Sequence, residues 1–309
     1  MKTKDRDIQS YIHIVDSFID QASLEKTQAE LIKKELKKYI SIRFERKKWV
    51  HPEITKFCTD WYREFYRMID GKDPYKELKE KSNEKALEIK QKVKINTFEE
   101  AVAAGIIGNK IDYGAALVHK VDLNTLEKEF SDIHNFAYSI NDMTKLKEKI
   151  KDAKTILFLA DNDGEIIFDT FLLEILTEKV GKANLFIMGK ESPMLNDVTV
   201  QDLKELRFER YGTIVSTGSN CFGLHIEDVS QECKDLLENV DLVIAKGQAY
   251  FEFFTEYNFP NIINLLRVKY PITGPGFGTI PSGENVIISS ERYAKYGKKY
   301  QRTKVQAYA

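Results

Sequence analysis

Acidic and amide side chains are concentrated directly after an apolar run near the middle of the chain. The run TILFLA (155–160) leads into DNDGE (161–165), and a helical pattern begins directly behind it. Carboxylate and amide oxygens are the ligands that hard divalent cations prefer. Helix capping would use one of these residues, with Asp161 or Asn162 as the N-cap and Glu165 on the first turn. The density of acids therefore favours a cation site over a simple cap.

A further carboxylate follows the next apolar run along the chain. ANLFIMG (183–189) leads into a polar segment in which Asp197 precedes another helical pattern. Taken alone, Asp197 is a candidate N-cap. If the two runs are adjacent parallel strands, however, their carboxyl ends meet at one edge of the sheet. Asp161, Asn162 and Asp197 could then share one cation, and Mg²⁺ or Mn²⁺ would suit these ligands and leave positions for water and substrate.

Basic and glycine-containing segments follow three further apolar runs and would suit a phosphate group. They are Gly218 with Ser219, Lys246, and Lys269. The backbone at Gly218 and Ser219 can hold phosphate oxygens or form an ordinary glycine turn, and the sequence favours neither. Either lysine can pair with phosphate as a compact charge, although each alone also fits a surface side chain. Carboxylates on two strand ends and lysines on others together fit a metal-bridged phosphate.

Six short apolar runs predict the elements that must position these side chains. They cover residues 155–160, 183–189, 213–218, 241–247, 261–268 and 285–290. Helical patterns of the length found in βαβ units separate the first five runs. Runs that are apolar on both faces indicate strands covered on both sides, as in a parallel sheet. We predict an α/β fold with a doubly wound, mainly parallel sheet sandwiched by helices.

The first half of the chain has a different pattern and predicts helices only. Helix-favouring stretches with apolar residues near a 3.6-residue period cover residues 21–49, 54–69, 75–93 and 97–115. We therefore expect an all-helical N-terminal domain over 1–150, an α/β metal- and phosphate-binding domain over 151–292, and a polar C-terminal tail over 293–309.

Composition narrows the possible classes of function. The 309 residues carry 47 Lys and Arg against 48 Asp and Glu, a net charge of −1, and a nucleic-acid binder would normally be strongly basic. No apolar run approaches the roughly 20 residues that cross a bilayer, and the N-terminus lacks the apolar core of a signal peptide. Three cysteines without a CxxC pair provide neither a disulfide framework nor a zinc site. We expect a cytoplasmic protein that binds neither nucleic acid nor membranes.

Six segments in a fixed order make the chain resemble a known family. They are DPYKELKEKSN (73–83), GNKID (108–112), ADNDGEIIFD (160–169), SPMLNDVT (192–199), DLVIAKGQAYFE (241–252) and LLRVKYP (265–271). The chain resembles the metal-dependent damage-control phosphatases, also known as acidic-residue-methyltransferase-like proteins. The resemblance implies an α/β sandwich with an N-terminal helical domain and phosphatase activity on small phosphate esters. It also implies a bound divalent cation, with Mn²⁺, Mg²⁺, Ni²⁺ and Co²⁺ as candidates.

The resemblance also assigns roles to individual residues. Its metal ligands fall on the three residues selected above, and it makes Lys269 the phosphate-contacting lysine. Lys246, which also stands at a strand end, is the second candidate. It places Gly247 and Gln248 beside the substrate.

In the predicted helical domain, Asn109 and Asp112 of GNKID would face the pocket, although Asn109 could equally cap a helix while Asp112 meets solvent. The chain has Asp163 where the family usually has Ala or Ser, and Tyr250 where it usually has Asn. We expect Asp163 to contact metal-bound waters or to act as a general acid, and Tyr250 to alter substrate recognition.

Other readings of the same residues stay open. Asp161 and Asp163 mimic the motif of haloacid-dehalogenase-type phosphatases, but Glu165 stands where that family needs Thr or Val. A carboxyl methyltransferase is disfavoured because no glycine-rich loop follows the first strand. A non-enzymatic protein that binds a metal or a phosphometabolite on the same fold is the alternative to an enzyme. The expected partner is a small phosphorylated metabolite, whereas its identity, the attacking group (water or Asp161) and the oligomeric state are not determined by sequence.

Overall fold

A seven-stranded sheet forms the centre of the part of the chain that the computed structural model describes, residues 15–16, 19–20, 22–44, 51–111 and 123–298. Its strands are β1 (Ile140–Asn141), β2 (Ile156–Leu159), β3 (Leu185–Gly189), β4 (Thr213–Ser216), β5 (Leu242–Lys246), β6 (Ile262–Arg267) and β9 (Asn285–Ser289). They lie in the order β1-β9-β6-β5-β2-β3-β4. Two further strands, β7 (Ile272–Gly274) and β8 (Gly278–Ile280), pair with each other outside this sheet.

The predicted α/β fold class is confirmed, and each of the six apolar runs forms a strand. Neighbouring strands from β4 to β6 are parallel, whereas β9 runs antiparallel to β6. The reversal has a simple cause, because the β7–β8 hairpin connects β6 to β9 instead of a crossover helix. β2 and β5 are buried at every position, as expected for central strands covered on both faces.

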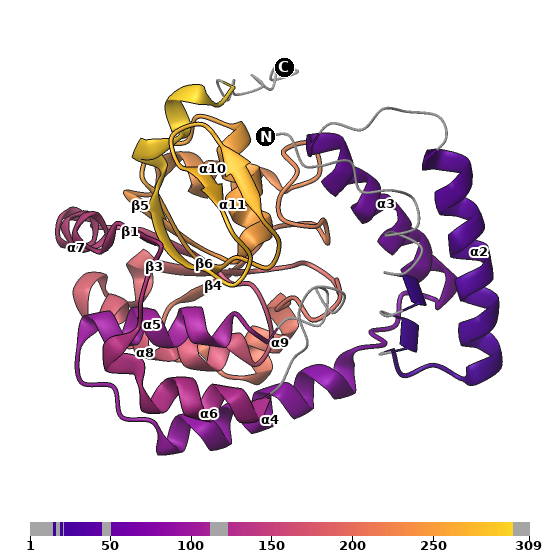
Figure 1. Cartoon of the computed structure of the whole chain (residues 1–309), viewed down its shortest axis with the longest axis horizontal. Helices are drawn as coiled ribbons and strands as arrows, with labels where there is room; N and C mark the ends of the chain where they lie inside the picture. The colour runs from indigo at the N-terminus through magenta and orange to yellow at the C-terminus, as the bar shows by residue number, and fades with distance from the viewer. Residues whose placement is uncertain (1–14, 17–18, 21, 45–50, 112–122, 299–309) are drawn as a thin grey trace.

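Helices cover both faces of the sheet (Figure 1). They are α2 (Lys26–Phe44), α3 (His51–Met68), α4 (Lys76–Lys92), α5 (Phe98–Gly108), α6 (Leu123–Ser131), α7 (Met143–Asp152), α8 (Glu165–Val180), α9 (Val200–Glu205), α10 (Gln231–Asn239) and α11 (Gln248–Glu256). Single 3₁₀ turns are η1 (Ile133–Asn135), η2 (Lys182–Asn184), η3 (Phe208–Arg210), η4 (Ser290–Arg292) and η5 (Ala294–Tyr296). Figure 1 shows α4, α5, α6 and α8 on one side of the sheet and α10 and α11 on the other, with α2 and α3 standing apart. Among the described helices, none combines the length and apolar character that a membrane crossing requires.

The hydrophobic core divides the chain differently from the predicted domain boundary at 150/151. The cluster on one face of the sheet joins side chains of α4, α5 and α6 to those of β2, β5 and α8. β1 also precedes the predicted boundary and pairs with β9. The separate cluster of the N-terminal helices is formed mainly by α2, α3 and residues up to Tyr75. By packing, the α/β unit therefore begins with α4.

The segment from residue 293 onward also differs in part from a polar tail. Tyr293 is 1 % exposed, and its hydroxyl accepts a hydrogen bond from the Asn264 side chain at 2.6 Å. Ala294 is buried as well. Residues 299–309 lie outside the described part of the chain. The C-terminal segment thus enters the core on the α11 side of the sheet before its last residues.

The order of the strands fixes where a ligand site can form. From β2 the chain proceeds outward to β3 and β4, then returns to β5 on the other side of β2 and continues outward to β6. The connections therefore diverge between β2 and β5, and sheets of this topology bind ligands in a crevice outside the carboxyl ends of the strands at such a point. The segments that follow these two strands are DNDGE (161–165) and Gly247.

Asp142 links β1 to the C-terminal segment and generates a prediction about stability. Its carboxylate accepts hydrogen bonds from the Ser289 N–H at 2.9 Å and from Arg292 Nε and Nη2 at 2.7 and 2.6 Å. Burial acts to raise the pKa of Asp142, but Arg292 and Ser289 outweigh it, so the folded-state pKa lies below its usual value. The stabilisation is therefore present above the unfolded-state pKa of about 4 and is lost as the pH falls through the folded-state pKa.

Replacing Asp142 with Asn should lower the free energy of unfolding by about 1–2 kcal/mol at pH 7, because a charged hydrogen-bonded pair is lost and Arg292 is only half-buried. Urea unfolding at pH 7 and pH 3 measures the effect, and the difference from wild type should shrink at pH 3. Asp152→Asn, at an exposed position at the end of α7, is the matched control. An equal difference at both pH values would contradict the assignment.

Candidate active site at the switch point of the sheet

The segments after β2 and β5 touch each other at the switch point. Gly247 adopts a φ of 79°, and a Cβ at this position would collide with the carboxylate of Asp161. Glycine is therefore required here for two reasons, the left-handed backbone and the close approach of the Asp161 side chain. Asp161 itself is 8 % exposed, so the protein encloses most of its side chain.

A backbone bridge joins the Asp161 segment to the Asp197 segment. Asn162 and Asp197 form an isolated antiparallel pair. The Val198 N–H donates to the Asp161 carbonyl and the Asp163 N–H donates to the Asn196 carbonyl, both at 2.9 Å. Residues directly opposite in an antiparallel pair project to the same side. The two segments that the sequence predicts as cation ligands are thus brought together, as the strand-end argument expects.

The first turn of α8 is not capped by a side chain. Gly164, with φ 79°, is the N-cap residue of α8 and no side-chain hydrogen bond is made there. The capping alternative for Asp161 and Asn162 is therefore not realised. Instead, Asn162 Nδ2 donates to Glu165 Oε2 at 2.9 Å, so the amide oxygen of Asn162 is the end of the group that faces away from Glu165.

Asn109 reaches the site from the end of α5, a helix whose start is fixed by a capping box at Thr97. Its Nδ2 donates to Asp161 Oδ2 at 2.9 Å and to Glu165 Oε2 at 2.8 Å. Its oxygen accepts from the Arg267 N–H at 3.0 Å. Asn109 is thus the C-cap residue of α5 and also contacts Asp161. Asp112 lies outside the described residues.

Lys246, expected as a candidate for phosphate binding, is fully buried in an ionic group. Its Nζ lies 2.5 Å from Glu165 Oε1 and 2.8 Å from Asp169 Oδ1, and it donates to the Gly105 carbonyl at 2.9 Å. Burial alone lowers the pKa of Lys246, but Asp169 and Glu165 raise it by more. Both the lysine and Glu165 are 0 % exposed, so the structure places them behind the crevice and not on its surface.

Two other ammonium groups face the two predicted acidic ligands. Lys269 Nζ lies 3.9 Å from Asp161 Oδ2, and Lys190 Nζ lies 3.7 Å from Asp197 Oδ2. Gln248 holds Lys269 in place by accepting its backbone N–H at 2.9 Å. Lys190 follows β3 directly, so the strand-end rule that selects Lys246 and Lys269 could also have selected it from the sequence.

The turn at Gly218 and Ser219 uses its own polar groups internally. The Gly218 N–H donates to Ser216 Oγ, and the Ser219 N–H donates to Thr217 Oγ1. The Ser219 hydroxyl accepts from Arg63 of α3 at 3.1 Å. This geometry is that of an ordinary glycine turn, one of the two alternatives left open by the sequence.

Tyr250 lies inside the protein at 1 % exposure, with the Lys190 ammonium 4.8 Å from the centre of its ring. Burial raises the pKa of the Tyr250 phenol. The side chain therefore contacts the site through Lys190, on the side of Asp197.

Asp163 is fully buried and faces α4. Its Oδ1 accepts from Asn83 Nδ2 at 2.9 Å, and its Oδ2 lies 3.3 Å from Lys79 Nζ. Lys79 also pairs with Asp202 and Asp73 at 2.5 and 3.2 Å. Burial raises the pKa of Asp163 to about 7 against the lowering effect of Lys79. Both carboxylate oxygens are thus engaged on the side of the helix.

The donors at the switch point fit a hard divalent cation. Two carboxylates and one amide supply only oxygen atoms, which Mg²⁺ and Mn²⁺ accept and which do not favour a zinc site. In the part of the chain that the structure describes, no group of three or more His, Cys, Asp or Glu side chains is arranged so that it could hold a metal ion. The predicted ligand set therefore depends on the amide of Asn162 as its third donor.

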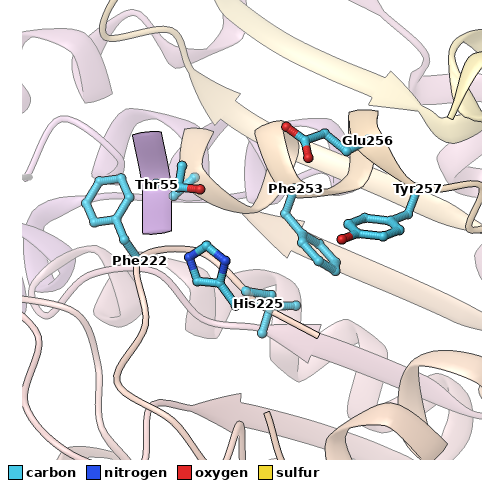
Figure 2. Close-up of a pocket in the computed structure, with 8 residues that line it drawn as sticks. Thr55, Phe222, His225, Phe253, Glu256 and Tyr257 are labelled. Atoms are coloured by element: carbon cyan, nitrogen blue, oxygen red, sulfur yellow. The ribbon is translucent and has the colours of Figure 1, made fainter. Parts of the chain in front are cut away.

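A small cavity lies apart from these residues, between α3, α11 and the loop after β4 (Figure 2). It is lined by Thr55, Phe222, Leu224, His225, Ala249, Phe253, Glu256 and Tyr257. The cavity has a volume of about 30 Å³, enough for one or two water molecules. The lining includes none of the predicted site residues, so the cavity does not extend the crevice at Asp161.

The chain is similar to known proteins over most of its length. Residues 8–274 match the damage-control phosphatase ARMT1-like domain. The damage-control phosphatase PH1575 of Pyrococcus horikoshii is 38% identical over 212 residues, which cover 67% of this chain and 72% of the relative. A damage-control phosphatase of Archaeoglobus fulgidus is 30% identical over 223 residues, covering 69% and 74%. The crystal structure of PH1575, described as a DUF89 family protein, has a TM-score of 0.77 at 29% identity, covering 94% of this chain and 99% of that one.

We predict that Mn²⁺ binds at the switch point and that Asp163→Ala leaves it bound, because both Asp163 oxygens face α4. Crystals soaked in Mn²⁺ should show an anomalous peak with oxygen ligands from Asp161, Asn162 and Asp197. Titration calorimetry should give a Kd for the variant raised no more than about tenfold, because no ligand is removed and Asn83 keeps its bond to the Gly164 N–H. Asp161→Asn, which weakens a predicted ligand, is the comparison variant. A collapse of affinity in Asp163→Ala would make Asp163 a direct ligand.

Proposed function

This chain belongs to the ARMT1-like damage-control phosphatase family, and we propose that it is a divalent-metal-dependent hydrolase of small phosphate esters. Relatives named as damage-control phosphatases support a phosphatase role. The observation that carries the proposal is the meeting of Asp161, Asn162 and Asp197 at the switch point, with Lys269 and Lys190 beside the two acids. The substrates we propose are sugar phosphates or related damaged phosphometabolites.

We assign the cation, which would be Mn²⁺, Mg²⁺, Ni²⁺ or Co²⁺, to Asp161, Asn162 and Asp197. When bound, it would supply Lewis-acid polarisation of the phosphate and lower the pKa of a water molecule. The donors support this assignment, since Asn109 and Glu165 orient the carboxylate of Asp161 and the amide of Asn162 by hydrogen bonds of 2.8–2.9 Å. Such outer contacts fix ligand geometry before the cation arrives.

In the proposed hydrolysis, the bond between phosphorus and the ester oxygen breaks, an oxygen from water takes its place, and the leaving alcohol gains a proton. Lys269 would hold non-bridging phosphate oxygens, because its ammonium lies 3.9 Å from Asp161 Oδ2 and thus on the side of the crevice where the phosphate must sit. Gln248 fixes the backbone of Lys269, from which this side chain extends. A fixed cation at this place stabilises the charge that develops during transfer. Lys190 would balance the charge of Asp197 from the opposite side.

The alternative is a protein that binds a metal or phosphometabolite without turnover. A panel of phosphate esters, assayed with each divalent metal in turn and with EDTA, separates the two. Release of inorganic phosphate that EDTA abolishes supports the enzyme. Mn²⁺ binding without release from any ester supports the binding protein. Location in the cytoplasm, where such metabolites are made, belongs to the same proposal.

Lys269→Ala should lower phosphatase turnover about a hundredfold, because one preorganised contact to a charged transition state contributes about 3 kcal/mol. Mn²⁺ affinity and Tm should change little, since the ammonium is not a ligand and lies at the crevice. Steady-state kinetics on the best ester of the panel measures the effect.

Lys81→Ala, on the exposed face of α4, is the matched control and should keep wild-type turnover. Lys246→Ala should instead lower Tm, because it leaves two buried carboxylates without their cation. Full turnover in Lys269→Ala, with a Tm equal to wild type, would remove Lys269 from the proposed mechanism.

A further inference from the structure

Helix α4 contacts the turn DNDG (161–164) that carries two of the proposed ligands. Asn83 accepts a hydrogen bond from the Gly164 N–H at 2.6 Å and donates from Nδ2 to Asp163 Oδ1 at 2.9 Å. Beside it, Ser82 lies so close that a Cβ at Gly164 would be 3.0 Å from its side chain. The side-chain amide of Asn83 therefore bonds both of the last two residues of the turn, with its oxygen as acceptor and its nitrogen as donor.

The opposite side of the turn is held by the segment that carries Asp197. The Asp163 N–H donates to the Asn196 carbonyl, and the Val198 N–H donates to the Asp161 carbonyl. Directly after these contacts comes Gly164, which adopts a φ of 79° and has no side chain of its own. The direction in which the turn presents its side chains thus depends on partners outside it, and Asn83 supplies the only side chain that bonds both Asp163 and Gly164 within the described residues.

The partner of Asn83 is itself fixed. Asp163 is fully buried, and its second oxygen faces Lys79 at 3.3 Å. The first oxygen is therefore oriented toward α4, and it requires a donor from position 83. At the same time the Gly164 N–H requires an acceptor from position 83. An asparagine satisfies both with one planar group, whereas an aspartate or an alanine at this position cannot.

We infer that Asn83 is a positioning residue for the proposed active site: its amide holds the turn in the conformation in which Asp161 and Asn162 face Asp197. The inference rests on the proposed function and deepens it. Asn83 acts through the turn and not on the substrate. Removing a partner that orients metal ligands typically lowers metal affinity or activity 10–100-fold.

An exchange of the two partners tests this role. Asn83→Asp keeps the acceptor for the Gly164 N–H but sets a second carboxylate against Asp163. The double variant Asn83→Asp/Asp163→Asn restores both hydrogen bonds with the donor and acceptor reversed, because the new amide at 163 can donate to the new carboxylate at 83. Asn83→Ala removes both bonds without adding charge. Asn135→Asp, which places a carboxylate beside Asp132 on the exposed surface, is the matched control.

Each variant is measured at the same pH for its Mn²⁺ Kd by calorimetry, for kcat and KM, and for Tm. We expect Asn83→Asp and Asn83→Ala to raise the Mn²⁺ Kd about 10–100-fold and to lower kcat by a similar factor, with KM within about threefold. The double variant should return both quantities to within about threefold of wild type. Asn135→Asp should match wild type throughout.

Two results would overturn the inference. One is a wild-type Mn²⁺ Kd in both single variants at Asn83. The other is a double variant with the Tm of wild type and the weak binding of Asn83→Asp, since restored bonds would then not restore the site. If a single variant fails to fold, the double variant still decides, because a restored Kd in it supports the role. The proposed function fails separately, through a wild-type protein that binds Mn²⁺ and releases no phosphate.

Discussion

The site depends on one buried ionic group, in which a single lysine pairs with two carboxylates. Lys246 is the last residue of β5 and places its ammonium in the core, where Glu165 and Asp169 of α8 meet it at 2.5 and 2.8 Å. Charges without water are costly unless every one is paired, so this group must form completely or not at all. The second carboxylate oxygen of Glu165, Oε2, accepts hydrogen bonds from the side-chain amides of Asn109 and Asn162. A single buried glutamate thereby orients the two side chains that border the Asp161 carboxylate. The arrangement of the proposed ligands thus depends on residues buried beneath them.

Helices α3 and α4 add to this arrangement, because they hold the loops after β2, β3 and β4. Tyr66 of α3 accepts the Leu195 N–H at 2.8 Å and stabilises a left-handed backbone at Leu195, with φ 52°, two residues before Asp197. α4 holds the turn after β2, and Arg63 of α3 bonds the loop after β4. A non-glycine residue at positive φ persists only where its surroundings determine it. The helical region therefore acts as a frame for the strand-end loops.

The sequence predicts the strands and the meeting of Asp161 with Asp197, because burial on both faces leaves long apolar runs and parallel strands align their carboxyl ends. It does not predict that Lys246 and Lys269, both near strand ends, have opposite surroundings. Lys246 is buried because it pairs with Asp169, which lies on α8. The local sequence pattern does not show where that helix packs. The packing of α4 against α8 is likewise not predictable from its sequence, since an amphipathic helix has the same pattern whether it packs on helices or on a sheet.

The buried lysine also affects the register in which β5 pairs with its neighbours, because side chains alternate between the two faces of the strand. Leu242 and Ile244 point into the cluster with α5 and α8, whereas Val243 and Ala245 point to the α11 side. Lys246 continues the first set. A slip of one residue in the pairing of β5 would turn its ammonium toward the apolar side that contains Phe251, without a carboxylate to meet it. The buried ionic group therefore disfavours a one-residue slip of the central strand.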